Sequence, residues 1–254
     1  MNSRNTIISV VLVIAVLGVG YILMQRGGTA PAGVVTQEGD RHYTQDTQYY
    51  TIDIAYPIQT ALGVRKGADA GADVKAMQTI ESTIEDIAQQ FKDAADPANL
   101  PQVEKDRLAG SGIKYSLTGN YYAYSSPSGI SYEFTFLSDT GGAHPNAFYK
   151  TLVFDTSGNI VALGDLFTSQ DYLSRISQIA KSQVTRQLTE EGAGGTIIEE
   201  GLAPTAENFQ NFVIDSDTLR IFIPPYQVAA YAAGSFEVEI PLTDLRDLLK
   251  ETVQ

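Results

Sequence analysis

The stretch IKYSLTGNYYAYSSPSGISYEFTFL, residues 113–137, decides the fold of this chain. Two runs rich in aromatic and β-branched residues, 113–124 and 130–137, flank the turn-forming sequence SSPSG at 125–129. The stretch therefore predicts an antiparallel hairpin. In the second run aromatic and polar side chains alternate, which is typical of a strand with one buried face. The aromatic set is Tyr132, Phe134 and Phe136, and the polar set is Ser131, Glu133 and Thr135.

A long amphipathic helix is predicted on each side of this hairpin. Over residues 73–95, and again over 169–189, apolar residues recur every three or four positions and form one stripe. Asp73 is expected to cap the first helix by accepting its free backbone amides, and Asp96 and Pro97 to end it. The first stripe consists of Val74, Met77, Ile80, Ile84, Ile87 and Phe91, and the second of Leu173, Ile176, Ile179 or Ala180, Val184 and Leu188.

The remaining elements indicate the fold class. Because long helices alternate with hairpins rather than with single strands, we expect mainly antiparallel sheets and an α+β class. The expected architecture is two packed antiparallel sheets, each covered by one long helix, preceded by one N-terminal transmembrane helix. The other predicted strands are 49–56, 147–154, 160–163, 209–214, 218–223 and 236–240, with a turn at 155–159 and a terminal helical stretch at 242–249.

The transmembrane helix is predicted at residues 7–24, an apolar run of 18 residues without a charge. This length is near the lower limit for a membrane span and exceeds the usual signal-peptide core of about 7–15 residues. We therefore favour a retained signal-anchor, although residues 30–32 (APA) have the pattern of a cleavage site. Arg4 precedes the run and the chain turns acidic after Arg26, which places residues 1–6 in the cytoplasm and the rest outside.

Beyond the anchor, we expect a tether followed by two folded units. Residues 25–47 are rich in Gly, Thr and Gln without a sustained period, and predict a flexible linker in which His42 is solvated. The folded part is then expected to divide into an N-terminal α+β subdomain at 48–140 and a C-terminal α+β subdomain at 141–254. This is the organisation of a single-pass protein of the bacterial cytoplasmic membrane with its folded part outside.

The charge of the chain is strongly acidic. Lys and Arg total 17 against 30 Asp and Glu, a net charge of −13, and without Arg4 and Arg26 the exported part carries a net −15. Such a surface repels phosphate backbones and disfavours nucleic-acid binding. It suits a cationic partner, although solubility alone explains an acidic surface equally well.

The composition also restricts the chemistry. The absence of cysteine excludes disulfides, thiolate metal sites and cysteine nucleophiles, and the two histidines are too few for a three-histidine zinc site. Glycine loops for phosphates and the Gly-x-Ser-x-Gly elbow are absent. The Ser-x-x-Lys match at 111–114 leads into a strand, and the oxygen-rich turn at 155–159 has Leu166 where a calcium loop needs glutamate. We expect no cofactor, no metal and no catalytic residue.

Three residues are candidates for binding. His144 lies between a Gly-Gly pair and a proline, so we expect it on a shaped loop between two strands. An imidazole there can exchange a proton near neutral pH or bond a backbone carbonyl, and the structural role is favoured. Tyr226 and Tyr231 follow a Pro-Pro pair, where they either anchor an irregular segment or present ring faces to a ligand.

Three sequence motifs carry a family resemblance. They are GGAHPN at 141–146, LGDLF at 163–167 before a long helix, and FIPPYQVAAYAAG at 222–234 before FEVEIPL at 236–242. Together they resemble the C-terminal domain of RsiV-type bacterial anti-sigma factors, which also accompanies peptidoglycan deacetylases of the PdaC type. Residues 48–138 are similar, more weakly, to the domain that usually precedes it.

The resemblance implies an extracytoplasmic α+β module of mostly unknown function, which binds lysozyme in RsiV-type proteins. The short N-terminus, the absence of a following deacetylase domain and the lack of a histidine cluster lead us to expect neither anti-sigma activity nor deacetylation. The expected function is a membrane-anchored binding or sensing module of the cell envelope, for a cationic protein such as lysozyme or for a cell-wall glycan. The alternatives are a small envelope hydrolase that uses His144 with nearby carboxylates, and a purely structural envelope protein.

Overall fold

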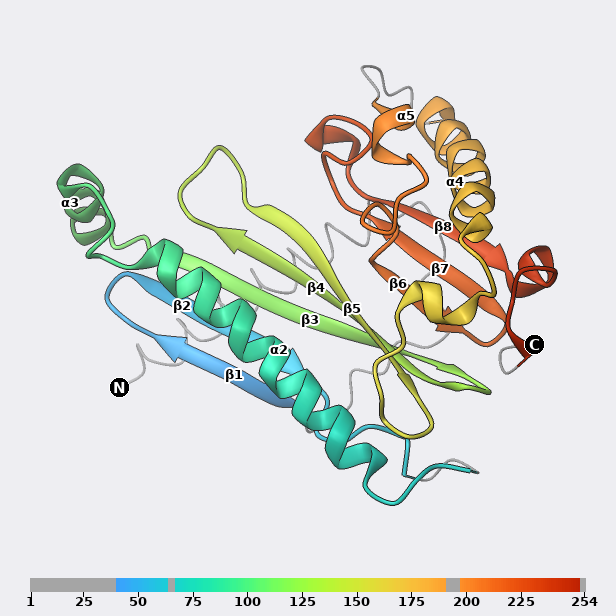
Figure 1. Cartoon of the computed structure of the whole chain (residues 1–254). Helices are drawn as coiled ribbons and strands as arrows, with labels where there is room; N and C mark the ends of the chain where they lie inside the picture. Colours follow the sequence, from blue (N-terminus) through green and yellow to red (C-terminus); the bar gives the residue numbers. More distant parts are fainter. Residues whose placement is uncertain (1–39, 64–66, 191–196, 252–254) are drawn as a thin grey trace.

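The computed structural model describes residues 40–63, 67–190 and 197–251. In this part of the chain a five-stranded sheet and a three-stranded sheet lie together with their helices, which confirms the predicted α+β class (Figure 1). The predicted N-terminus at 1–6, the signal-anchor at 7–24 and most of the linker lie outside the described residues. Among the helices that are described, none combines the length and the apolar character needed to cross a membrane.

The five-stranded sheet has the order β1-β2-β3-β4-β5. Its neighbours pair antiparallel except β2 and β3, which are parallel, so the expectation of antiparallel sheets is wrong at this pair. The chain runs from β2 through two helices before β3 begins, and a connection of this length is what a parallel pair requires. The bounds are β1 (Arg41–Asp46), β2 (Tyr50–Tyr56), α2 (Ala72–Ala95), α3 (Gln102–Ser111), β3 (Tyr115–Ser126), β4 (Gly129–Asp139) and β5 (Asn146–Asp155).

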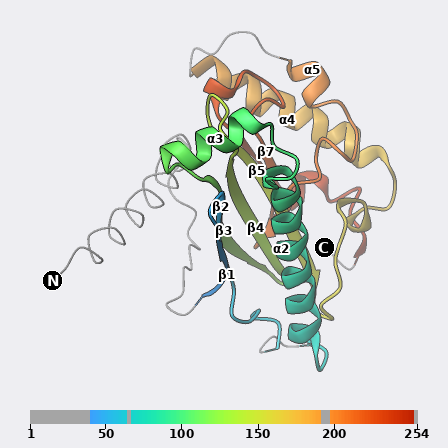
Figure 2. The same cartoon turned by 90° about the vertical axis from the view of Figure 1, so that its left-hand side faces the viewer.

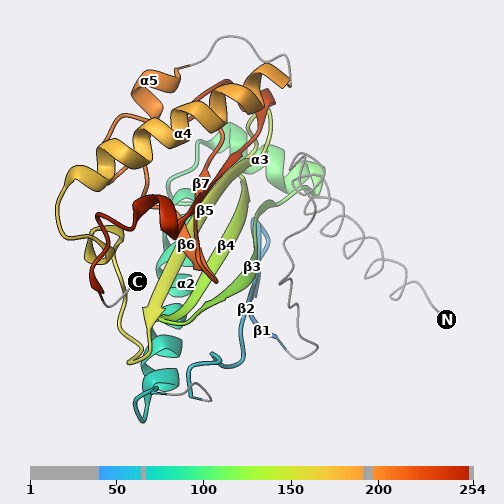
Figure 3. The ribbon, with the colours of Figure 1, turned by 90° about the vertical axis from the view of Figure 1, so that its right-hand side faces the viewer.

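The three-stranded sheet has the order β6-β7-β8 and is antiparallel throughout. The helix α4 precedes it in sequence and lies along it in space (Figure 3). Short helical turns make up most of the other named elements. The bounds are η1 (Leu163–Leu166), α4 (Asp171–Glu190), α5 (Ile198–Gly201), β6 (Phe212–Asp215), β7 (Thr218–Ile223), η2 (Tyr231–Ala233), β8 (Phe236–Pro241) and η3 (Leu242–Leu245).

Helix α2 covers one face of the five-stranded sheet (Figure 2). Its predicted apolar stripe packs into the core, with the exception of Val74, which is 61% exposed. Val74 lies about 120° around the helix from Ile80, because successive residues are about 100° apart. Ala76 and Ala88 occupy core positions instead, and their small side chains bring the helix close to the sheet.

Asp73 does not cap α2, which corrects the sequence-based expectation. The N-cap is Gly71, in a left-handed conformation with φ 90°, and no side-chain cap is present there. The Asp73 carboxylate instead accepts the hydroxyl of Thr60 and the backbone amides of Leu62 at 3.2 Å and Gly63 at 3.0 Å. Asp73 therefore holds the segment that follows β2 against the first turn of α2.

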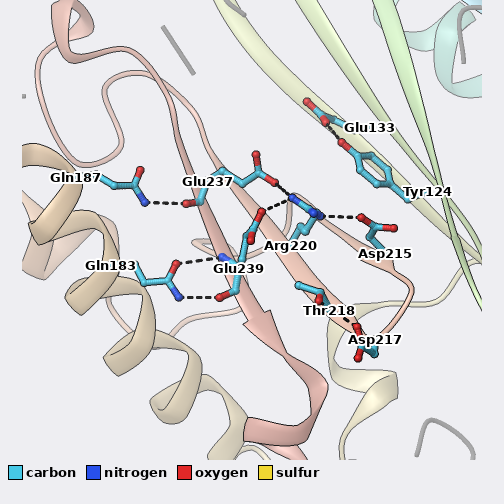
Figure 4. A network of polar contacts seen from close by, with 10 residues as sticks. All are labelled: Tyr124, Glu133, Gln183, Gln187, Asp215, Asp217, Thr218, Arg220, Glu237 and Glu239. Carbon is cyan, nitrogen blue, oxygen red and sulfur yellow. Dashed lines mark hydrogen bonds and ion pairs between the residues drawn. The ribbon is translucent and has the colours of Figure 1, made fainter. Parts of the chain in front are cut away.

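Helix α4 buries its predicted stripe against the three-stranded sheet, with Ile176, Ala180 and Val184 fully enclosed. Two glutamines of the same helix satisfy the outer edge of β8 (Figure 4). The Gln183 side chain donates to the Glu239 carbonyl at 2.7 Å and accepts a hydrogen bond from the Glu239 amide at 3.1 Å. Gln187 donates to the Glu237 carbonyl at 2.9 Å. The helix thus blocks pairing of another strand at this edge.

The opposite edge of the small sheet, β6, is satisfied by the large sheet. The Thr151 hydroxyl accepts the Phe212 amide at 3.0 Å, and the Ser131 hydroxyl accepts the Ile214 amide at 3.2 Å. Ser131 is only 1% exposed. The prediction of a half-buried strand is therefore wrong over residues 129–134 of β4, where both faces are buried because the second sheet covers the polar one.

The first sheet extends beyond its predicted limits at both ends. Strand β5 pairs with β4, so the sheet continues past residue 140, the predicted boundary between the two subdomains. At the other edge, residues 41–46 form β1, and the prediction of a flexible linker is wrong for them. Side chains attach this strand to α2, because Arg41 pairs with Glu81 and Lys92 donates to the Tyr43 hydroxyl at 2.6 Å.

Replacing Ser131 by alanine should destabilise the protein by at least about 1 kcal/mol, because the buried Ile214 amide loses its acceptor. Urea unfolding of the two proteins measures this difference. The matched control is Ser82→Ala, which removes an exposed hydroxyl from α2 and should change the unfolding free energy by less than about 0.5 kcal/mol. Equal effects of the two substitutions would contradict the structural role of Ser131.

Candidate functional site

His144, Tyr226 and Tyr231, the three residues that the sequence nominates for binding, meet at the surface of the protein. His144 lies in the loop between β4 and β5, Tyr226 follows β7, and Tyr231 begins η2. The His144 ring stacks on Tyr231 with centroids 3.6 Å apart and planes 16° apart. The Tyr226 ring lies 6.1 Å from His144 and 5.4 Å from Tyr231. We call these three residues the aromatic cluster.

The hydrogen bonds of His144 define its neutral tautomer. Its Nδ1 lies 3.0 Å from the Pro145 carbonyl, which can only accept, so the proton of the neutral ring is on Nδ1. Its Nε2 lies 3.0 Å from the Tyr226 hydroxyl and therefore accepts a hydrogen bond from it. The Tyr231 hydroxyl donates to the same Pro145 carbonyl at 2.8 Å, which fixes the stacked pair to the loop.

Tyr226 occupies a strained backbone conformation. Its φ of 72° lies in the left-handed region, which costs a residue with a side chain on the order of 1 kcal/mol. The residue is nevertheless 53% exposed. The strained backbone therefore holds this large ring at the surface.

The other end of the β4–β5 loop contacts α3. Gly141 has φ 80°, and a Cβ there would lie 2.8 Å from Nη2 of Arg107 and 3.3 Å from the Tyr115 ring. Arg107 donates to both oxygens of Glu104, at 2.9 and 2.6 Å, and the Tyr115 hydroxyl donates to the same carboxylate at 2.6 Å. Sequence reasoning missed α3 because the helix has no apolar stripe and buries only Leu108.

The ion pair beside this loop should respond to acid. Hydrogen bonds from Arg107 and Tyr115 lower the pKa of Glu104 from 4.5 to about 2. Because the pKa falls on folding, the contact stabilises the folded protein above about pH 4.5 and is lost as the pH falls towards 2. A carbon-13 NMR titration of the Glu104 carboxyl should show a midpoint well below 4.5. A midpoint at 4.5 in the folded protein would contradict the contact, and Arg107→Gln should move the midpoint upward.

A hydrolase that uses His144, the alternative function, requires a carboxylate beside the imidazole. The polar partners of His144 are the Pro145 carbonyl and the Tyr226 hydroxyl, and no carboxylate in the described ranges is hydrogen-bonded to it. Within the same ranges, no three His, Asp or Glu side chains are grouped so as to hold a metal ion.

A second polar cluster, which sequence reasoning missed, surrounds Arg220 on β7 (Figure 4). The Arg220 side chain is 16% exposed and pairs with Asp215 at 3.1 Å, with Glu237 at 2.7 Å and with Glu239. Burial disfavours its charge, but the Glu237 hydrogen bond and the three carboxylates hold the pKa of Arg220 above its ordinary value. The only sequence signal is one charged residue, Arg220, between the apolar residues Leu219 and Ile221. Because three carboxylates of the same protein pair with the guanidinium, the geometry indicates a structural role for Arg220.

Comparison with protein families finds a match in the C-terminal part of the chain. Residues 164–243 match the model of a protein family of unknown function, DUF3298. This part of the chain is therefore similar to DUF3298 domains. It includes Tyr226 and Tyr231, while His144 precedes it.

A curated relative extends the comparison. The peptidoglycan-N-acetylmuramic acid deacetylase PdaC of Bacillus subtilis (strain 168) is 34% identical over 113 residues, which is 44% of this chain and 24% of PdaC. The chain thus matches about a quarter of the length of this relative. The predicted relation to PdaC-type proteins is confirmed.

One of two similar solved structures supports a shared fold. A DUF3298 family member from Bacteroides fragilis NCTC 9343 superposes with a TM-score of 0.54 at 17% identity, covering 84% of this chain and 93% of that one. A DUF3298 family protein from Pseudomonas aeruginosa PAO1 gives a TM-score of 0.49 at 13% identity, with the same coverage. At such identity the first match shows a common fold alone.

Replacing Tyr226 by glycine should leave the unfolding free energy unchanged or raise it by up to about 1 kcal/mol, because glycine adopts positive φ without strain. Tyr226→Ala keeps the strained backbone and is the matched comparison. Thermal unfolding of both variants tests this expectation. If the glycine variant were clearly less stable than the alanine variant, the left-handed backbone at this position would not be strained.

Proposed function

We propose that this chain is a non-catalytic binding or sensing module of the cell envelope, and that the aromatic cluster is its recognition site. The observation that carries the proposal is the exposed ring of Tyr226, held by a strained backbone beside the stacked pair of His144 and Tyr231. Exposed tyrosines on a rigid support are typical anchors of protein interfaces, since they bury a large area at a low entropy cost. The DUF3298 assignment alone leaves the ligand open.

The favoured partner is a cationic protein such as lysozyme. The net charge of −13 attracts such a protein and accelerates encounter with it. The apolar run at residues 7–24 supports a location at the bacterial cytoplasmic membrane, with the folded part outside, where such proteins arrive.

A cell-wall glycan is the second candidate. The matched relative is named a peptidoglycan-N-acetylmuramic acid deacetylase, so a related segment exists in a protein that acts on peptidoglycan. Aromatic faces such as that of Tyr226 can pack against the apolar C–H face of a pyranose ring. A glycan would not require the acidic charge of the chain, and its binding should depend little on salt.

Binding of the full chain in mild detergent to immobilised hen lysozyme and to sedimented peptidoglycan sacculi tests the proposal. We expect saturable binding to lysozyme that weakens with salt, and a loss of at least about tenfold in affinity for Tyr226→Ala. Ile160→Ala, which removes another exposed apolar side chain outside the cluster, is the matched control and should leave the affinity unchanged.

The outcomes separate the candidates. Binding to sacculi alone, with the same dependence on Tyr226, would replace the cationic protein by the glycan. Binding that ignores Tyr226 would remove the aromatic cluster as the recognition site. Absence of binding to both probes would leave the envelope-binding proposal without its ligand classes and count against it.

A further inference from the structure

Neutral His144 makes the Tyr226 oxygen a hydrogen-bond acceptor towards solvent. Because Nδ1 of His144 carries the proton, Nε2 takes the hydroxyl hydrogen of Tyr226 at 3.0 Å. The lone pairs of the Tyr226 oxygen are then directed away from His144, and donation by the hydroxyl strengthens them as acceptors. Since the residue is 53% exposed, a donor from another molecule can approach this atom.

Protonation of His144 reverses this hydrogen bond. In the imidazolium both nitrogens are donors, so Nδ1 keeps the Pro145 carbonyl and Nε2–H now donates to the Tyr226 oxygen. The Tyr226 hydroxyl hydrogen must then point outward, and the group becomes a donor towards solvent. The stacked Tyr231 ring, 3.6 Å away, accommodates the charged imidazole through its negative face.

We propose that the aromatic cluster takes a guanidinium or ammonium group of its partner on the Tyr226 oxygen and ring, and releases it when His144 is protonated. This inference rests on the proposed function, because it names the chemical group recognised at the same site. A cationic donor matches the acceptor oxygen and the face of the Tyr226 ring in the neutral state. In the protonated state the cationic donor faces the outward hydroxyl hydrogen of Tyr226. It also lies within about 6 Å, or two hydrogen-bond lengths, of the positive charge on His144.

The reversal of the hydrogen bond depends on protonation of His144 and not on the other ionisable groups near it. On its own loop, Asp139 accepts the Gly141 amide at 2.9 Å. On α3, which contacts the loop at Gly141, Glu104 and Arg107 neutralise each other. From the segment after β7, the ionisable groups in contact with His144 are the two tyrosines of the cluster.

A small probe tests the inference on the full chain. N-acetyl-argininamide is titrated into protein labelled with carbon-13 at the tyrosine rings, and the Tyr226 signal is assigned by its absence from Tyr226→Phe. N-acetyl-citrullinamide, a neutral analogue of nearly the same shape, is the matched control probe. We expect a saturable shift of the Tyr226 signal by the arginine probe at pH 8, a roughly tenfold weaker affinity at pH 5, and a weaker effect of the citrulline probe at both pH values.

Two variants assign the effect to its residues. His144→Phe keeps a ring to stack on Tyr231 but cannot titrate, so the affinity for the arginine probe should no longer change between pH 5 and 8. Tyr226→Phe keeps the ring and loses the acceptor oxygen, so the probe should bind several-fold more weakly at pH 8. In this variant, binding of the probe is measured through the Tyr231 signal.

The inference is overturned by an absent or non-saturable shift, by equal affinity at the two pH values, or by a pH dependence that persists in His144→Phe. These results differ from failure of the proposed function, which concerns binding to lysozyme or sacculi. If the arginine probe binds with the expected pH dependence and neither macromolecule binds, the site chemistry stands and the partner class is wrong. If lysozyme binds through Tyr226 without pH dependence, the function stands and the reversal is wrong.

Discussion

The arrangement of the two sheets depends on two hydroxyl groups that satisfy the edge of β6. Ser131 and Thr151 project from the five-stranded sheet and accept the amides of Ile214 and Phe212. A buried amide without a partner costs about as much as a lost hydrogen bond, so a shifted placement of β6 would be penalised at two positions. The glutamines of α4 likewise form hydrogen bonds with the backbone of the β8 edge. Within the described residues, side chains therefore satisfy backbone groups at both edges of the small sheet.

The aromatic cluster follows from this arrangement because its members come from different sheets. His144 lies on a loop of the large sheet, while Tyr226 and Tyr231 lie between two strands of the small one. The loop is also held from its other side, where Gly141 packs against Arg107 of α3. Contacts on both sides thus hold the loop where His144 and Tyr231 are both hydrogen-bonded to the Pro145 carbonyl.

The comparisons give a family resemblance and a shared fold, and the chemistry of the cluster goes beyond them. The DUF3298 assignment carries no function, and the Bacteroides fragilis structure shares the architecture at an identity too low to transfer a site. The relation to PdaC covers about a quarter of that enzyme. The case for recognition therefore depends on physical features of this chain: strain at Tyr226, its exposure, and the tautomer of His144.

Local periodicity was sufficient to predict many elements of the fold. The alternation around Phe134 and the helical stripes through Ile80 and Ile176 report which face of a segment is apolar, and this depends only on neighbouring residues. The same reasoning failed where burial was partial or distant. Val74 belongs to the apolar set but not to the buried face, and α3 lacks a stripe because it packs with one side chain.

What the sequence determined by itself is the class of the protein and the identity of its candidate residues, because composition, periodicity and motifs are properties of short segments. The tertiary structure alone decided that β2 and β3 run parallel, that the polar face of β4 is buried, and that His144 bonds Tyr226 across 82 residues of chain. Each of these is a contact between segments distant in sequence. Its free energy depends on which buried polar groups find partners, and that is settled only when the sheets pack together.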